Sequence, residues 1–183
     1  MSDFKSSSIG TSATPNATGG GFDGAEKETI TVSNINGEII TTILLDITGL
    51  LVSGTATDII GEDGVAAAYI TRITTAVNGV VYKAEMACIE TPAGSNTTKD
   101  IDLVTNSNSL AEDAAYDSGG GVDTDVIITG ADWKGGSARA TTSGQDLNAL
   151  VGDYLYLANG SGANTGGTYT AGKFVIKLYG ASF

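Results

Sequence analysis

Apolar and polar positions alternate along much of this chain, most clearly between Val65 and Glu90. The alternation runs from Val65 to Thr75, Asn78-Gly79 follows, and the alternation resumes from Val80 to Glu90. A period of two is typical of a half-buried strand, and Asn-Gly favours the tight turn of a two-stranded hairpin. The pattern therefore predicts a long antiparallel hairpin over residues 65–90.

One face of the returning strand of this hairpin is apolar throughout. It comprises Val80, Tyr82, Ala84, Met86 and Cys88. The opposite face, with Val81, Lys83 and Glu85, is mixed. Because alternate residues of a strand point to opposite faces, we expect the first row to face the core and Cys88 to be a small buried hydrophobe.

Similar patterns predict further short strands separated by glycine-rich turns. A first hairpin pairs residues 28–33 with 38–47 around Asn36-Gly37. The other expected strands are residues 57–60, 101–104, 125–129, 153–158 and 173–179. Tyr154 and Tyr156 share a face, and residues 159–167 form a loop. Helix is expected only as one turn over residues 110–116 and weakly over residues 141–150.

These elements predict an all-β fold, an antiparallel β-sandwich or jelly roll with an extended N-terminal arm. Residues 1–25 carry repeated Ser and Gly with few large apolar side chains, so we expect an arm that is ordered by contact with a neighbouring subunit. Residues 26–183 are expected to form a single β-sandwich domain.

The charge balance argues against two classes of partner. The chain has 9 Lys plus Arg and 21 Asp plus Glu, giving a net charge of -12. Such a charge repels phosphate backbones and anionic lipid surfaces, so we expect neither nucleic acid nor a membrane as partner. No apolar leader follows Met1, and polar residues interrupt the most apolar stretch, residues 39–52. We expect a protein made in a cytoplasm, without a transmembrane helix.

Residue content also weighs against enzymatic chemistry. The chain has no His and one Cys, so a Ser-His-Asp triad is impossible and Cys88 lacks an imidazole to activate it. The same scarcity of imidazole and thiolate argues against zinc. We expect no catalytic residues, no cofactor and no enzymatic activity.

Two glycine motifs resemble phosphate-binding loops and lack the required context. Gly167 to Lys173 fits the first seven positions of a P-loop, but Phe174 replaces the Ser or Thr that holds magnesium, and a strand pattern follows. Gly19 to Gly24 matches GxGxxG without a preceding strand. We interpret the first motif as a hairpin turn and the second as linker.

Carboxylate pairs leave calcium open as an alternative. Asp100 and Asp102 lie on one strand face, as do Asp123 and Asp125, and Glu62-Asp63 occupies a turn. The full EF-hand pattern is missing, and acidic turns are expected in an acidic protein. A glycosidase could also use paired carboxylates, but the chain offers one Trp for a sugar platform.

Aromatic residues are the candidates for subunit contacts. They are Phe4, Phe22, Trp133, Tyr154 and Tyr156. Trp133 could be a surface anchor or a sugar platform, although a partly buried packing residue is the commoner outcome.

Six stretches of the chain carry a likeness to a known family: Tyr69–Tyr82 (YITRITTAVNGVVY), Cys88–Gly94 (CIETPAG), Asp100–Leu103 (DIDL), Ala111–Ala115 (AEDAA), Asp153–Leu157 (DYLYL) and Thr168–Gly180 (TYTAGKFVIKLYG). Through these stretches about half of the chain resembles virion structural proteins of marine tailed phages. These are scaffold patterns, and they transfer no active-site residue.

The resemblance implies a decoration or cement protein on the capsid surface of the virion. Its expected partners are the major capsid protein and copies of itself, in a trimer. The arm and the sheet edges would make the contacts, because an unpaired strand edge can add a further strand. The alternatives are a tail, fibre or knob component, a subunit that polymerises into filaments, and a carbohydrate-binding module.

Overall fold

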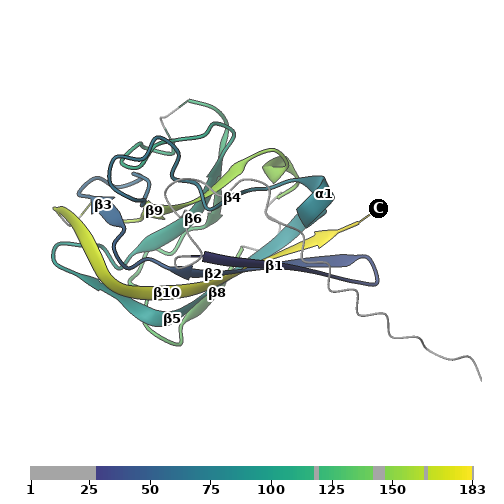
Figure 1. Cartoon of the computed structure of the whole chain (residues 1–183), viewed down its shortest axis with the longest axis horizontal. Coiled ribbons are helices and arrows are strands. Elements are labelled where there is room, and N and C mark those ends of the chain that lie inside the picture. Colours follow the sequence, from purple (N-terminus) through teal and green to yellow (C-terminus); the bar gives the residue numbers. More distant parts are fainter. Residues whose placement is uncertain (1–27, 118–119, 142–146, 163–164, 183) are drawn as a thin grey trace, which may run out of the picture.

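Two antiparallel sheets pack against each other in the computed structural model, which describes residues 28–117, 120–141, 147–162 and 165–182 (Figure 1). The predicted all-β sandwich is confirmed. The expected arm, residues 1–25, lies outside the described residues, together with Phe4 and Phe22. No helix in the described part of the chain is long and apolar enough to cross a membrane.

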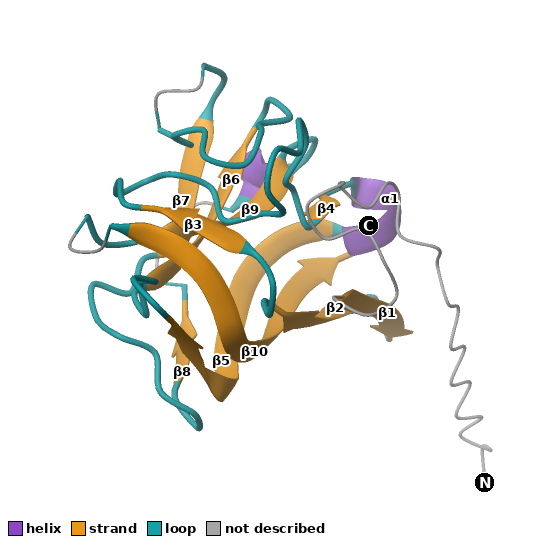
Figure 2. Ribbon diagram, turned by 60° about the vertical axis from the view of Figure 1, so that its left-hand side comes forward, coloured by secondary structure: helices purple, strands orange, loops and turns teal. Residues whose placement is uncertain are grey.

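The larger sheet has six strands, ordered β1-β2-β10-β5-β8, with β3 pairing the start of β10. The bounds are Glu28–Ile35 for β1, Glu38–Asp46 for β2, Leu51–Ser53 for β3, Val80–Gly94 for β5, Ala138–Ala140 for β8 and Gly166–Ala181 for β10. Figure 2 shows that the two long strands, β5 and β10, bend strongly along their length. Register shifts between them accompany this bend.

The smaller sheet has four strands, ordered β4-β9-β6-β7. Their bounds are Thr71–Arg72 for β4, Ile101–Asn106 for β6, Asp123–Ile127 for β7 and Tyr154–Asn159 for β9. Two short helical turns connect strands, α1 over Thr75–Asn78 and the 3₁₀ turn η2 over Asn148–Leu150.

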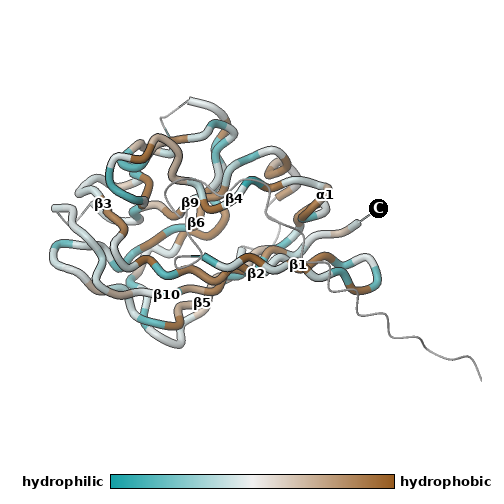
Figure 3. The backbone as a smooth tube through the Cα atoms, in the orientation of Figure 1, coloured by the Kyte–Doolittle hydropathy of each residue, from teal (hydrophilic) through white to brown (hydrophobic). Residues whose placement is uncertain are grey.

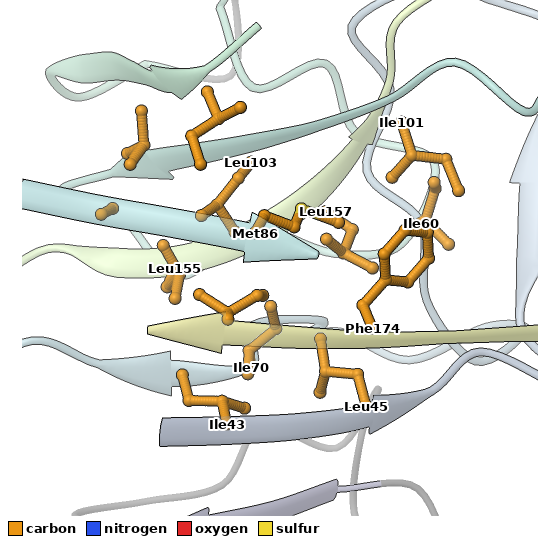
Figure 4. Close-up of a cluster of buried hydrophobic side chains, with 14 of the residues drawn as sticks. Ile43, Leu45, Ile60, Ile70, Met86, Ile101, Leu103, Leu155, Leu157 and Phe174 are labelled. Atoms are coloured by element: carbon orange, nitrogen blue, oxygen red, sulfur yellow. The ribbon is translucent and has the colours of Figure 1, made fainter. Parts of the chain in front are cut away.

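The core lies between the two sheets. Ile43, Leu45, Met86 and Phe174 from the larger sheet meet Ile101, Leu103, Leu155 and Leu157 from the smaller one (Figure 4). Hydrophobic positions mark the strands of both sheets along the chain (Figure 3). A second cluster beside the smaller sheet includes Ile59, Val104 and Tyr156.

The hairpin predicted at residues 28–47 is confirmed. β1 and β2 pair without a break from Glu28 opposite Leu45 to Ile35 opposite Glu38. Asn36 and Gly37 both have positive φ, 55° and 87°, which is what a two-residue hairpin turn requires.

The hairpin predicted at residues 65–90 is wrong in its first half. Residues 65–70 form no strand, and β4 pairs with β9 rather than with β5. Asn78 ends the helical turn α1, where its side chain accepts a hydrogen bond from Thr74 N at 2.9 Å and donates one to Thr41 Oγ1 at 2.9 Å. The segment leads from the smaller sheet to the larger one, so β4 and β5 belong to different sheets.

The predicted buried face of β5 is confirmed only from Ala84 onward. Ala84, Met86 and Cys88 are buried, but Tyr82 is 50% exposed and Val81 takes its place in the core. The pairing with β10 explains this difference, because Lys83 lies opposite Tyr179 while Val81 lies opposite Gly180. One extra residue on β5 reverses which side chains point inward.

Four of the five remaining strand predictions are confirmed, and the helical turn expected at residues 110–116 is not. The strands expected at residues 101–104, 125–129, 153–158 and 173–179 are present as β6, β7, β9 and part of β10. Residues 57–60 form only isolated bridges, and residues 110–116 contain turns but no helix. Of residues 141–150, positions 142–146 lie outside the described residues, and η2 is the one helical turn in the rest.

Candidate interaction surface

Two of the five aromatic residues predicted at subunit contacts lie in the interior. Trp133 and Tyr156 are each 0% exposed, whereas Tyr154 is half-buried. Phe4 and Phe22 lie outside the described residues. Burial of Trp133 and Tyr156 therefore corrects their expected place on the surface, and Tyr154 alone of the described three can reach a partner.

Trp133 is a core residue with a satisfied polar group. Its Nε1 donates a hydrogen bond to Ile101 O at 2.7 Å, and its ring contacts Phe174 edge-on, with the centroids 5.5 Å apart. The Arg139 guanidinium covers the ring at 4.6 Å. The indole is thus enclosed, and it offers no platform for a sugar.

Tyr156 and Tyr154 hold loops against the smaller sheet. Tyr156 Oη accepts a hydrogen bond from Leu110 N and donates one to Asn108 O, both at 2.8 Å, which ties residues 108–110 to β9. Tyr154 packs against Tyr69 with ring centroids 4.7 Å apart, and Arg72 lies over its ring at 5.3 Å. These contacts give the pair a structural role within the chain.

The outer face of the six-stranded sheet carries an apolar belt, defined as Leu44, Val175, Ala87 and Ala138. Register places these residues side by side, because Val175 lies opposite both Leu44 and Ala87, and Ala87 lies opposite Ala138. Leu44 is 45% exposed, and Val175 and Ala87 are half-buried. The described chain therefore leaves a continuous apolar stripe in contact with water, a common mark of a contact surface.

Charged rows border the belt on both sides. On one side Lys173 Nζ lies 3.6 Å from Asp46 Oδ2 and 3.7 Å from Glu90 Oε2. On the other side Lys177 lies opposite Glu85 and Thr42. Exposed pairs of this kind contribute little to folding, so their main effect is on which partner the face accepts.

A hollow of about 490 Å³ opens over the belt where β10, β5 and β8 lie side by side. Its lining consists of Glu85, Met86, Ala87, Ala138, Arg139, Ala140, Val175 and Lys177. Three of these residues are alanines, whose side chains end at Cβ, so the surface of the sheet is depressed at this point. The hollow combines an apolar floor with charged groups at the rim, as binding pockets usually do.

Glu85, in the lining of the hollow, is held by its neighbours. Lys83 Nζ lies 2.6 Å from Glu85 Oε1, and Tyr179 Oη donates to Glu85 Oε2 at 2.7 Å. Both contacts lower the pKa of Glu85, Lys83 more strongly, and the same hydrogen bond raises the pKa of Tyr179 to about 12. Lys177, by contrast, makes no salt bridge with any described residue.

The strand edges of the larger sheet form a second potential contact. β1 pairs with β2 on one side, and β8 pairs with β5 on one side; neither has a further strand partner among the described residues. The unpaired backbone groups of such edges can add an extended segment from another chain.

Of the carboxylates considered for calcium, Asp100, Asp102 and Asp125 accept hydrogen bonds within the fold, and Glu62 and Asp63 are exposed in a separate turn. Thr129 N donates to Asp102 Oδ1 at 2.8 Å, Thr129 Oγ1 donates to Asp100 Oδ1, and Tyr116 Oη donates to Asp125 Oδ1 at 2.6 Å. Asp123 is exposed. No group of three or more potential ligands for a metal ion occurs in the part of the chain that the structure describes.

Asp102 has the most perturbed carboxyl among these residues. Burial is the largest cause and the negative charge of Asp100 adds to it, so the pKa of Asp102 rises to about 6 despite the hydrogen bond from Thr129. A raised pKa of this kind can mark a functional acid, but structural networks produce it as well.

The two glycine motifs do not form phosphate sites in the described residues. Gly167 to Lys173 lies within β10, where Gly167 pairs with Val52 and Lys173 faces outward, so the motif is neither a P-loop nor the expected hairpin turn. Gly19 to Gly24 lies outside the described residues. Cys88 is buried as expected, and burial, aided by Glu90, raises the pKa of its thiol.

Comparison with known proteins adds no relative: no family model, no curated protein and no solved structure matches this chain.

Reasoning from the sequence missed the apolar belt. A signal for it was present in the doubled apolar residues Ile39-Ile40 and Leu44-Leu45, which place apolar side chains on both faces of β2. Recognising the belt also required the register of β2, β10, β5 and β8 together, and only the fold supplies this register.

Proposed function

We propose that this chain is a non-enzymatic structural protein of a tailed-phage virion, a decoration protein that stabilises the capsid through contacts with the major capsid protein and with its own copies. The observation that carries the proposal is the apolar belt on the outer face of the larger sheet. This stripe is in contact with water in the isolated chain. When a neighbour covers it, burial of apolar surface stabilises the contact by about 25 cal/mol for each Å².

The outer edges of β1 and β8, which have no further strand partner among the described residues, support the same proposal. Backbone pairing along an edge fixes the direction and register of a neighbour, while the belt supplies apolar area. Repeated over many copies on a closed shell, modest contacts of this kind reinforce the particle.

Removal of residues 1–25 tests the proposed role of the arm. We expect the trimmed chain to retain its circular dichroism spectrum and its unfolding midpoint, and to lose cosedimentation with undecorated heads that bind the full chain. The Ser6→Ala variant of the full chain is the control and should bind normally. A trimmed chain that still decorates heads fully would show that the contact lies elsewhere.

A further inference from the structure

We propose that the outer edge of β1 pairs with the same edge of a second copy of this chain. The two strands run antiparallel, with Thr31 of each copy opposite Thr31 of the other, so a two-fold axis passes through this position. The two larger sheets then join into one continuous sheet. This deepens the proposed function, on whose contact between copies it rests, because it names the strand and the register that make this contact.

The end strands of the two sheets differ in length and regularity. β1 has eight residues and pairs with β2 without a register shift. β8 and β4 have only three and two residues, and β7 has five with a register shift in its pairing with β6. Proteins keep edge strands short or bulged where these must not add another strand. Among the described residues, the edge of β1 is therefore the end strand best suited to pair with another chain.

Charge also distinguishes β1 from the other end strands. Its sequence, ETITVSNI, holds one charged residue, Glu28 at its start, and no lysine, arginine or proline that would block pairing. β7 carries Asp123 and Asp125, β8 carries Arg139 and β4 carries Arg72. Pairing of one of these strands with its own copy brings like charges together, which is destabilising. The edge of β1 avoids this repulsion.

The side chains of β1 complement one another in the proposed register. Ile30 lies opposite Val32 of the second copy, and Thr29 lies opposite Ser33. Ile30 packs against the core, and Val32 shares its face of the strand, where both are half-buried. Thr29 and Thr31 are exposed on the other face. Aliphatic side chains thus meet aliphatic ones, and hydroxyl groups meet hydroxyl groups, as stable cross-strand pairs do.

The neighbouring registers match less well. With Val32 on the axis, Ile30 lies opposite Asn34, and with Ile30 on the axis, Glu28 lies opposite Val32. Each of these registers sets a polar or charged group against an aliphatic one. In the proposed register Glu28 lies opposite Asn34, and residues 28–34 of both copies overlap over about 24 Å of strand.

This pair leaves the apolar belt of both copies uncovered. An axis perpendicular to the joined sheet turns the outer faces of the two copies to the same side. Both belts then lie on one face, where they remain available for the contact with the capsid. Two linked contacts hold more tightly than one, because the second forms at a high effective concentration.

Charge substitutions at Thr31 test the pair and its register, with the mass in solution measured by sedimentation equilibrium. We expect the full chain to sediment with twice its mass of 18.4 kDa. Thr31→Lys and Thr31→Glu each place like charges opposite one another, so each should raise the dissociation constant by about tenfold or more. An equimolar mixture of the two variants should recover the pair, because opposite charges then face each other.

Thr29→Lys is the matched control. Thr29 lies on the same face of the same strand, but the two introduced charges stay about 14 Å apart along the edge, so the pair should persist. Because Thr29 and Thr31 are both exposed, all of these variants should keep the circular dichroism spectrum of the wild type.

A full chain that sediments only as a monomer, or as the trimer that the family resemblance implies, would overturn the proposal. So would an equimolar mixture of Thr31→Lys and Thr31→Glu that stays monomeric. The masses are measured on the isolated chain. A monomeric chain that still decorates heads would contradict the pair and leave the proposed function standing, and a paired chain that fails to bind heads would do the reverse.

Discussion

At the scale of single residues, the polar atoms of the buried aromatic side chains have hydrogen-bond partners inside the core. Trp133 is enclosed, yet its Nε1 reaches Ile101 O, and Tyr156 Oη is used both as donor and as acceptor. A buried polar atom without a partner costs about 1–3 kcal/mol, so these bonds are needed for the aromatic rings to lie inside. The sequence identified the aromatic residues, but their inward direction depends on partners in distant strands.

Asp102 links folding stability to pH. Its pKa in the folded chain is about 6, above the usual value of 3.8, so the folded state favours the protonated form. The resulting stabilisation is complete below the unfolded pKa and is lost as pH rises through about 6. Between pH 5 and pH 8, this group should lower the free energy of unfolding by about 1–2 kcal/mol.

Urea unfolding of Asp102→Asn checks this linkage. The amide keeps an oxygen for Thr129 N but cannot ionise. The difference in free energy of unfolding between variant and wild type should therefore change by about 1–2 kcal/mol between pH 5 and pH 8. The exposed Asp123→Asn is the control, with a difference that does not depend on pH. If the free energies of unfolding of wild type and Asp102→Asn differed by the same amount at every pH, the raised pKa of Asp102 would be contradicted.

At the scale of elements, the structure depends on close approach between α1 and β10. A Cβ built on Gly180 would lie 1.8 Å from Asn78 O, and one on Gly79 would lie 2.6 Å from Ala181 O. Gly79 also has a φ of 66°, which glycine adopts readily. These two glycines let the end of α1 lie directly against the last strand.

We expect Gly180→Ala to destabilise the fold. The added methyl group displaces the backbone at Asn78, and overpacking of this kind costs about 1–3 kcal/mol. Gly162→Ala is the matched control, because its Cβ would meet no atom closer than 3.6 Å. Thermal unfolding of both variants measures the difference in stability. Equal midpoints would show that the backbone at Asn78 moves to accommodate the methyl group without loss of stability.

The elements also show which predictions the sequence can support. The β1–β2 hairpin was predictable because its alternation and its Asn36-Gly37 turn are both local. The segment 65–75 was not, because Thr71 pairs with Leu155, more than 80 residues away. Likewise, the reversal at Tyr82 depends on β10, so no local pattern in β5 reveals it.

At the scale of the whole molecule, most of the basic residues of the described chain belong to the larger sheet. Seven of the nine Lys and Arg residues lie in the described chain, and Lys83, Arg139, Lys173 and Lys177 belong to β5, β8 and β10 of the larger sheet. The smaller sheet and its connections carry many acidic residues, among them Asp58, Asp102, Asp125 and Asp153. The larger sheet also carries acidic residues, among them Asp46, Glu85 and Glu90, so both signs border the apolar belt and their pattern would fix how a neighbour sits on it.

We propose that this chain works as a contact-forming part of a phage head. The most direct measurement is quantitative mass spectrometry of purified virions of the phage whose genome encodes this chain, with heads separated from tails. We expect the chain in the head fraction, in a fixed ratio to the major capsid protein. Its absence from purified particles, or its presence in the tail fraction alone, would contradict the account.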